Sequence, residues 1–397
     1  MDQKLLAVKV RRLATIDDFL TLLNQMKRED QGVNFYPFTI KQINYFRNPS
    51  HDSRYHSFKL PKKGGGVREI SAPRNETFKL LLRYVNEMLK AIYAPSMYAM
   101  GFTEGRSVVT NAQVHLNQNY VFNTDLKDFF PSVDQARVWA RLQLKPLCIQ
   151  KPIASIIAGL CSVKLVTAEK KVRYVLPQGA PTSPILTNMV CDTLDRRLGG
   201  MAGRFGLKYS RYADDITFSS MHNVYEEGGD FRKELRRVIE GQHFTINERK
   251  TRLQKKGARQ EVTGLIVGNR INVPQSYVRE IRNLLYIWRK YGEKEARKRF
   301  RISYMAKKGH IKEECPDMVH VLVGKLCYLQ MVKGAKDSVY RRLSTDFDEL
   351  LNGKRKMVAP AQSQGQLSTE GNKLILNPEI IDVDLLDQDL DVVLGNG

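Results

Sequence analysis

Two adjacent aspartates, Asp214 and Asp215, are the residues of this sequence best suited to chemistry. They lie between two β-prone runs, 209–212 and 216–219, so the segment predicts a hairpin with both carboxylates at its tip. Adjacent carboxylates repel each other, and a chain gains little from this arrangement unless a divalent cation neutralises them. An isolated Asp-Asp pair is more often an ordinary turn, so a metal site needs support from elsewhere in the chain.

A third carboxylate, Asp125, ends a run that predicts a buried strand. Residues 121–126 read Val-Phe-Asn-Thr-Asp-Leu, which would bring Asp125 to a strand end, although a capping or turn role is the simple alternative. Three carboxylates on neighbouring strand ends suit two Mg²⁺ ions that activate an attacking hydroxyl and hold a leaving phosphate. We therefore predict that Asp125, Asp214 and Asp215 are metal ligands and catalytic residues.

The elements that must position these carboxylates change in character along the chain. Residues 1–55 have a mainly helical, polar pattern, and short β-rich runs then alternate with helical stretches such as 78–92 and 137–144. This alternation predicts a mixed sheet covered by helices. The pattern from about 275 to 350 is purely helical, which indicates a separate helical domain.

The charge of the chain favours a polyanionic partner. The chain has 64 Lys and Arg against 42 Asp and Glu, a net charge of +22, although residues 361–397 are themselves acidic. Such a cationic surface favours nucleic acid, while a merely soluble basic protein is the alternative. The N-terminus does not read as a secretory signal, and no run approaches the roughly 18 apolar residues of a membrane span. We expect a cytoplasmic protein with no membrane association.

Four segments, in order along the chain, resemble motifs of the reverse transcriptases. They look like the fingertip hairpin, the first carboxylate motif, the nucleotide-binding loop and the catalytic YxDD box. In that order they are residues 61–68 (PKKGGGVR), 125–130 (DLKDFF), 176–184 (LPQGAPTSP) and 212–215 (YADD). The resemblance implies an α+β right-hand polymerase, in which fingers and a palm with an antiparallel sheet are joined to an α-helical thumb.

The resemblance also implies a division of the chain. The expected parts are an N-terminal helical extension (1–55), fingers (56–122), a palm (123–274) with interleaved fingers (about 135–175), a helical thumb (275–350), and a linker with an acidic tail (351–397). The tail is expected to be flexible, and its role stays open.

Several residues would contact the incoming nucleotide if the resemblance holds. Lys62, Lys63 and Arg68 would bring positive charge to a triphosphate from a glycine-rich tip, with a solvated basic turn as the alternative. Gln178 would contact the nucleotide, and Gly179 permits a close approach of the backbone. The implied substrates are dNTPs.

Phe130 and Lys250 have further implied roles. Phe130 occupies the family's sugar-gate position, where a ring crowds out a 2′-hydroxyl, and Phe129 is expected to pack in the core. Lys250 matches the lysine near the departing pyrophosphate, which it would stabilise or protonate. A solvated run of charge is the alternative for Lys250.

Two short signatures are similar to those of retron reverse transcriptases. The sequence NAQVH, from Asn111 to His115, matches their NAxxH element, and Val262, Thr263 and Gly264 match their VTG element. On physical grounds alone His115 is more often a structural histidine, and the VTG element could simply start a strand. The resemblance leads us to predict that all five bind RNA.

Three arginines of the expected thumb are further RNA-binding candidates. Arg279, Arg282 and Arg289 would contact phosphates and 2′-hydroxyls of an RNA–DNA duplex. An ordinary basic helix face is the alternative.

For a retron enzyme the implied function is synthesis of branched multicopy single-stranded DNA (msDNA) from a cognate structured noncoding RNA. The primer would be the 2′-hydroxyl of an internal guanosine, and two Mg²⁺ ions would serve each active site. The RNA–DNA hybrid would stay bound to the enzyme, and a host RNase H would remove the template. A toxic effector protein of the same operon is a possible partner in antiphage defence.

Other functions remain open from the sequence. A group II intron-like or abortive-infection reverse transcriptase would share the catalytic motifs, but neither is expected to carry the NAxxH and VTG pair. A catalytically silent RNA-binding protein would also be basic. Loss of Asp125, Asp214 or Asp215 would have favoured it, and all three are present.

Overall fold

The chain forms two compact units, each described here by itself. The computed structural model describes residues 2–61, 66–167, 169–306 and 315–357. In so far as they are described, residues 1–59 and 68–263 form the first unit, and residues 60–67 and 264–397 form the second. Within the described ranges, no helix is long and apolar enough to cross a membrane.

The first unit mixes helices and strands, as the sequence predicts. Its helices are α1 (Gln3–Arg12), α2 (Ile16–Gln31), α3 (Ile40–Phe46), α4 (Glu76–Ile92), α5 (Val108–Val114), α6 (Gln135–Gln143), α7 (Lys151–Leu160), α8 (Ser183–Arg204) and α9 (Asp230–Glu240), with short 3₁₀ turns η1 (Asp52–Arg54) and η2 (Glu248–Lys250). Its strands are β1 (Tyr55–Pro61), β2 (Val67–Pro73), β3 (Tyr120–Asp125), β4 (Val163–Val166), β5 (Val172–Val175), β6 (Lys208–Tyr212), β7 (Asp215–Ser220), β8 (Arg252–Lys255) and β9 (Glu261–Val262). Residues 60–61 of β1 and residue 67 of β2 belong to the second unit.

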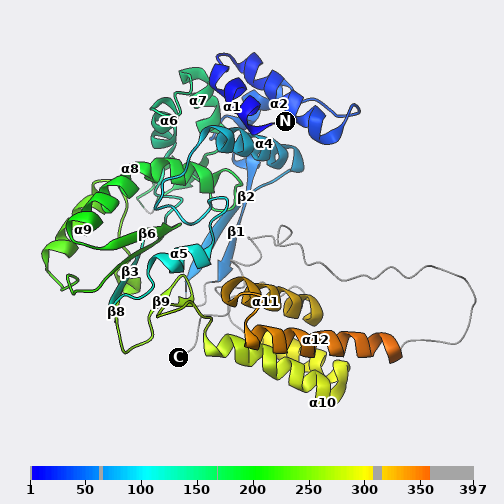
Figure 1. Cartoon of the computed structure of the whole chain (residues 1–397). Coiled ribbons are helices and arrows are strands. Elements are labelled where there is room, and N and C mark those ends of the chain that lie inside the picture. Colours follow the sequence, from blue (N-terminus) through cyan, green and yellow to red (C-terminus); the bar gives the residue numbers. More distant parts are fainter. Residues whose placement is uncertain (1, 62–65, 168, 307–314, 358–397) are drawn as a thin grey trace, which may run out of the picture. The chain divides into compact units, whose positions relative to one another are not determined.

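The N-terminal helices pack on α4, as Figure 1 shows in blue. Local sequence determines where they begin. Thr15 accepts a hydrogen bond from the backbone of Asp18, whose side chain accepts one in return from the backbone of Thr15, so a capping box starts α2. Asn75 caps α4 by accepting a hydrogen bond from the backbone of Phe78, and Phe78 and Val85 of α4 are fully buried.

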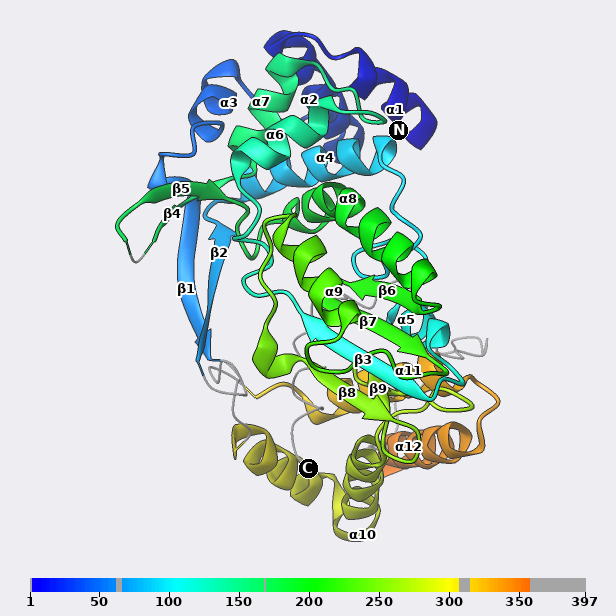
Figure 2. The same cartoon turned by 90° about the vertical axis from the view of Figure 1, so that its left-hand side faces the viewer.

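A four-stranded antiparallel sheet carries the predicted catalytic segments. Its strand order is β6-β7-β3-β8, which confirms the expected antiparallel palm sheet. Figure 2 shows α8 and α9 against this sheet, and α5 contacts β6. Side chains alternate between the faces of a strand. Tyr209 and Arg211 of β6 therefore bond to Asp195 of α8, whereas Ser210 bonds to Asn111 of α5.

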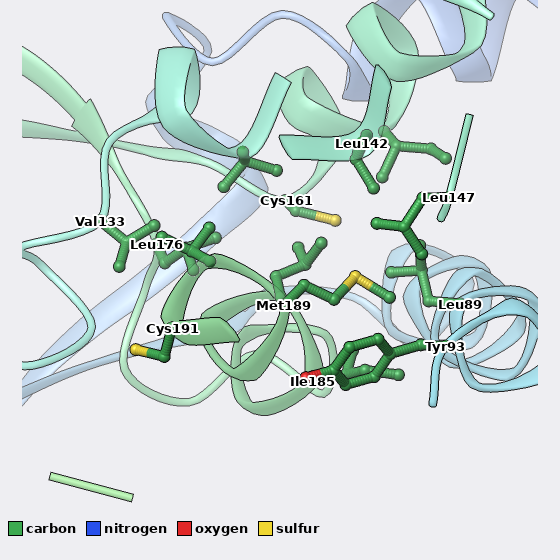
Figure 3. Packing of buried hydrophobic residues seen from close by; sticks show 14 of the residues in the cluster. Leu89, Tyr93, Val133, Leu142, Leu147, Cys161, Leu176, Ile185, Met189 and Cys191 are labelled. Atoms are coloured by element: carbon green, nitrogen blue, oxygen red, sulfur yellow. The ribbon is translucent and has the colours of Figure 1, made fainter. Parts of the chain in front are cut away.

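The core of this unit lies where α4, α6 and α8 meet. Met189 of α8 is fully buried, and Figure 3 shows it among Leu89, Leu142 and Leu147. Because such interiors are close-packed, this core fixes α8 against α4 and α6. The same helix carries Asp195, which supports the catalytic hairpin described below.

Arg54 anchors the start of β1. Its buried guanidinium donates to the carbonyl oxygens of Phe46 (2.6 Å), Gly159 (3.1 Å) and Ser162 (2.7 Å). The carbonyls at the end of a helix have no partner within the helix, and here Arg54 supplies one for α7.

The second unit is mainly helical where the structure describes it. It contains β10 (Leu265–Ile266), α10 (Gln275–Ala306), α11 (Met318–Lys333) and α12 (Ser338–Met357). The apolar residues whose spacing predicts the first helix are buried in it: Tyr277, Ile281, Leu284, Leu285 and Trp288. Gly292 interrupts α10 with a φ of 81°, so this element is two helices joined at a kink.

Candidate active site

The sheet brings the three predicted carboxylates to one end. Asp125 ends β3, Asp215 begins β7, and the two residues are direct partners in the antiparallel register. Asp214 lies in the turn between β6 and β7, and its carbonyl oxygen accepts a hydrogen bond of 2.9 Å from the nitrogen of Leu126. The predicted hairpin and the predicted strand are therefore both present, and all three carboxylates are half-buried.

Two side chains from the segment before β8 hold the carboxylate of Asp125. Asn247 Nδ2 donates to Oδ1 at 2.9 Å, and Lys250 Nζ donates to Oδ2 at 3.0 Å. The backbone nitrogen of Asn247 also donates to the carbonyl oxygen of Asp125. Lys250, a predicted catalytic residue, is thus at the carboxylate cluster, with 64% of its side chain exposed.

The other two carboxylates retain protons more strongly than an ordinary aspartate. Partial burial, followed by repulsion from Asp125, raises the pKa of Asp214 to about 7. Burial raises the pKa of Asp215 to about 7 as well, with repulsion from Asp214 and Asp125 as the next causes. The free energy of this cluster would fall if a cation neutralised it.

The donor set suits Mg²⁺, since it consists of carboxylate oxygens on rigid strand ends. As the side chains stand, however, no group of three or more His, Cys, Asp or Glu residues is arranged as a finished metal site in the described part of the chain. Each oxygen of Asp125 accepts one hydrogen bond, Oδ1 from Asn247 and Oδ2 from Lys250.

The turn that holds Asp214 is supported from behind by a glycine. Ala213 has a φ of 54°, in the left-handed region, and its backbone nitrogen lies against Gly101. A Cβ atom at Gly101 would lie 2.6 Å from that nitrogen, so only glycine fits there.

A buried ion pair fixes the strand that leads into the turn. Arg211 and Asp195 are both fully buried and form two bonds of 2.8 Å. Arg211 also donates to the carbonyl oxygen of Ala213 at 3.0 Å and to Asn188 at 3.1 Å. Its position therefore links α8 to the catalytic turn.

The two phenylalanines after Asp125 differ in exposure, as expected for a core ring and a sugar gate. Phe129 is buried against Phe244, whereas Phe130 is half-buried and faces Phe102. This placement agrees with a core role for Phe129. Contact of Phe130 with a sugar stays a prediction.

The predicted nucleotide loop packs on strand β2. The carbonyl oxygen of Gln178 accepts a 2.7 Å hydrogen bond from the nitrogen of Ser71 in β2. Gly179 has a φ of 124°, and a Cβ there would lie 2.9 Å from Ile70. The close backbone approach that we predicted at Gly179 is thus an approach to β2. The side chain of Gln178 is half-buried, and its contact with a nucleotide stays a prediction.

Of the three cations predicted to bind the triphosphate, the structure describes one, Arg68. Arg68 is half-buried on β2. Lys62 and Lys63 lie outside the described residues.

The NAxxH and VTG elements require a correction. Asn111, His115 and Val262 are each 1% exposed or less, and the first two bond to neighbouring protein side chains. Buried side chains cannot contact RNA, so the structure favours the structural alternative for these three. Thr263 and Gly264 form a turn with φ values of 44° and 79°, and their RNA-binding role stays a prediction.

The three predicted thumb arginines are exposed on α10 but differ in their partners. Arg289 bonds to Asp346 at 2.8 Å and Glu349 at 3.0 Å, both on α12. An RNA phosphate would have to compete with these carboxylates. Arg279 and Arg282 are exposed at the start of the helix, as an RNA-contacting face requires.

Sequence reasoning missed three residues that shape the site: Asn247, Arg211 and Asp195. Asn247 could have been noticed, because it lies three residues before Lys250 in the same short segment. The Arg211–Asp195 pair gives no local signal, since its members belong to different elements and meet only in the folded chain.

Comparisons with known proteins agree with the site. Residues 60–283 match the family model "Reverse transcriptase (RNA-dependent DNA polymerase)". Retron Mx65 reverse transcriptase of Myxococcus xanthus is 38% identical over 58% of this chain and 55% of the relative. Retron Mx162 reverse transcriptase of the same organism is 34% identical over 67% of this chain and 59% of the relative. Retron Ec86 reverse transcriptase of Escherichia coli is 34% identical over 66% of this chain and 78% of the relative. The chain thus spans little more than half the length of the first two relatives.

Proposed function

The chain belongs to the reverse transcriptases of the retron type, and we propose that it is an RNA-directed DNA polymerase that makes msDNA. Its template would be a cognate structured noncoding RNA, and its primer the 2′-hydroxyl of an internal guanosine. The observation that carries the proposal is the alignment of Asp125 with Asp215 at one sheet end, with Asp214 in the adjoining turn. The family match covers this whole region.

Reverse transcriptases generally depend on divalent metal ions, and we propose two Mg²⁺ ions held by Asp125, Asp214 and Asp215. When bound, the ions would activate the attacking hydroxyl and neutralise charge on the phosphates. The primer oxygen then bonds to the α-phosphorus of the dNTP, and the bond to the pyrophosphate oxygen breaks.

The remaining residues of the site bind and orient the reactants. Lys250, whose ammonium lies 3.0 Å from Oδ2 of Asp125, would stabilise or protonate the leaving pyrophosphate. The half-buried ring of Phe130 excludes a 2′-hydroxyl from the sugar. Lys62, Lys63 and Arg68 hold the triphosphate, and Gln178 contacts the nucleotide.

The partners follow from this function. The RNA and its RNA–DNA hybrid bind the basic protein, with Arg279 and Arg282 as candidate phosphate contacts. A host RNase H removes the template, and the complex restrains an effector protein of the same operon in antiphage defence.

The test is extension by purified protein with Mg²⁺ and dNTPs on the noncoding RNA encoded beside its gene. We expect DNA joined to RNA through a 2′–5′ linkage, which a debranching enzyme releases. The polymerase proposal is wrong if wild-type protein makes no DNA or if Asp214→Ala and Asp215→Ala make as much as wild type. A product primed only from 3′ ends would contradict the retron assignment and favour another reverse transcriptase lineage.

A further inference from the structure

A continuous chain of side-chain hydrogen bonds lies on the face of the sheet that contacts α5. Ser219 Oγ is 2.7 Å from Nδ1 of His115, and Nε2 of His115 is 2.7 Å from Ser210 Oγ. Ser210 Oγ donates to Asn111 Oδ1 at 2.6 Å, and Asn111 Nδ2 donates to Thr263 Oγ1 at 3.1 Å. The chain thus joins β7, α5, β6 and the turn after β9.

The direction of each bond in this chain follows once Ser210 Oγ is assigned as the donor to Asn111 Oδ1. Ser210 has one hydroxyl proton and gives it to Asn111, so it must accept from Nε2–H of His115. Nδ1 of His115 is then the acceptor for the hydroxyl of Ser219. Burial lowers the pKa of His115 to about 3, so the ring stays neutral at physiological pH. Both ring nitrogens are therefore satisfied in one defined tautomer.

The position of this chain relates it to the catalytic turn. Ser210 and Ser219 lie on the two strands that enter and leave the turn with Asp214 and Asp215, and both serines are fully buried. A single ring, that of His115, therefore bridges both strands of the catalytic hairpin. Fully satisfied buried polar networks select one arrangement of the groups they join.

Thr263 supplies an independent observation at the far end of the chain. Its φ of 44° lies in the left-handed region, which β-branched residues rarely adopt. Glycine or asparagine would fit this backbone with less strain. The hydroxyl that accepts from Asn111 gives a physical reason for a threonine in this place.

We propose that Asn111 and His115, with Ser210, Ser219 and Thr263, form a positioning network that sets the catalytic hairpin. The network determines how the turn presents Asp214 and Asp215 to the metal ion and the nucleotide. Its buried members do not contact RNA. This inference rests on the proposed polymerase function, whose reaction it would tune.

The test compares Ser210→Ala and Ser219→Ala with Ser162→Ala. Ser162, which follows α7, is an equally buried serine whose hydroxyl donates a 2.7 Å hydrogen bond to the carbonyl oxygen of Ala158. Removing this hydroxyl is therefore a matched control for the loss of stability. We expect kcat at saturating RNA and dNTP to fall about 10-fold in the two network variants and less than about 2-fold in the control. RNA affinity should stay at the wild-type value in all three.

Substitutions of His115 provide a rescue experiment. His115→Ala removes both bonds, whereas His115→Gln keeps an amide donor where Nε2 lies, so His115→Gln should recover part of the lost kcat. If His115→Ala fails to fold, Thr263→Val replaces it in the comparison with Ser162→Ala. This substitution removes the last hydroxyl of the hydrogen-bond chain at a half-buried position. Thr263→Val should lower kcat, as the other network variants do.

Mn²⁺ binding, measured by electron paramagnetic resonance, separates this proposal from the polymerase proposal. The network variants should bind Mn²⁺ more weakly than Ser162→Ala even if wild-type protein makes no DNA. The positioning role is overturned if Mn²⁺ affinity and kcat in the network variants match those of the control. It is also overturned if the variants lose RNA affinity and keep kcat, since that outcome would mean RNA recognition.

Discussion

Asp195 and Asp214 both serve the same hairpin, but the protein treats their charges in opposite ways. Asp195 is fully buried and receives two bonds from Arg211 and one from Tyr209. Asp214 is half-buried beside Asp125 and Asp215, and its pKa is raised to about 7. Where a carboxylate only supports the fold, its charge is paired inside the protein. At Asp214, which we propose to be a metal ligand, negative charges lie close together at a cost in stability.

The largest effect is expected at the unpaired carboxylates. Asp215→Asn should lower DNA synthesis by at least about 1,000-fold, because several kcal/mol of charge stabilisation by bound metal are lost. The melting temperature should not fall. Asp230→Asn is the control, since its carboxylate is 90% exposed at the start of α9. Activity retained in Asp215→Asn would remove the distinction between the two kinds of carboxylate.

The second effect concerns the paired carboxylate and is expected in stability. Asp195→Asn should lower the free energy of unfolding by about 3–5 kcal/mol, because it leaves the buried guanidinium of Arg211 without a counter-charge. Urea titration measures it. Asp346→Asn, in an exposed ion pair with Arg289, should cost less than about 1 kcal/mol. Equal losses in the two variants would contradict this account of burial.

The third effect tests the lysine that contacts Asp125. Lys250→Ala should lower kcat by about 100-fold if its ammonium assists departure of pyrophosphate. Arg249→Ala is the matched control, since Arg249 is an exposed neighbour in the same charged run. Single-turnover kinetics with saturating dNTP measures both. Similar losses would favour the simple alternative of a solvated basic segment.

The smallest effect is a dependence of stability on pH. The pKa of Asp214 is about 7 in the folded protein against an ordinary value of 3.8, so the folded state binds this proton more tightly. The stabilisation is complete below about pH 4 and is lost as pH rises through about 7. Without metal, Asp214→Asn should therefore be more stable than wild type at pH 8 by about 1–3 kcal/mol, and less so at pH 5. A constant difference from pH 5 to 8 would contradict the raised pKa.

Local sequence was sufficient to predict the elements of the site. The β-prone runs around Asp214 form the hairpin, Asp125 ends a buried strand, and the helical periodicity after residue 274 corresponds to α10. These predictions depend on periodicity and turn chemistry, which neighbouring residues determine.

Contacts between distant segments could not be predicted in the same way. Nothing near His115 indicates that its ring will lie between Ser210 and Ser219, about a hundred residues along the chain. The family resemblance suggested RNA binding for a residue that the fold buries. A short signature thus marks a position without stating whether its side chain faces a ligand or the protein interior.

The close approach of Gly101 to the catalytic turn has a consequence for mutational scanning of this protein. Position 101 carries no functional group, yet a single methyl group there would collide with the backbone of Ala213, which cannot move aside as a flexible side chain can. In a library scored by DNA synthesis, Gly101 would therefore be as intolerant as the aspartates. A map of intolerant positions would therefore place Gly101 in the active site. A parallel measurement of metal binding or folding would separate residues that take part in the reaction from positions where no side chain fits.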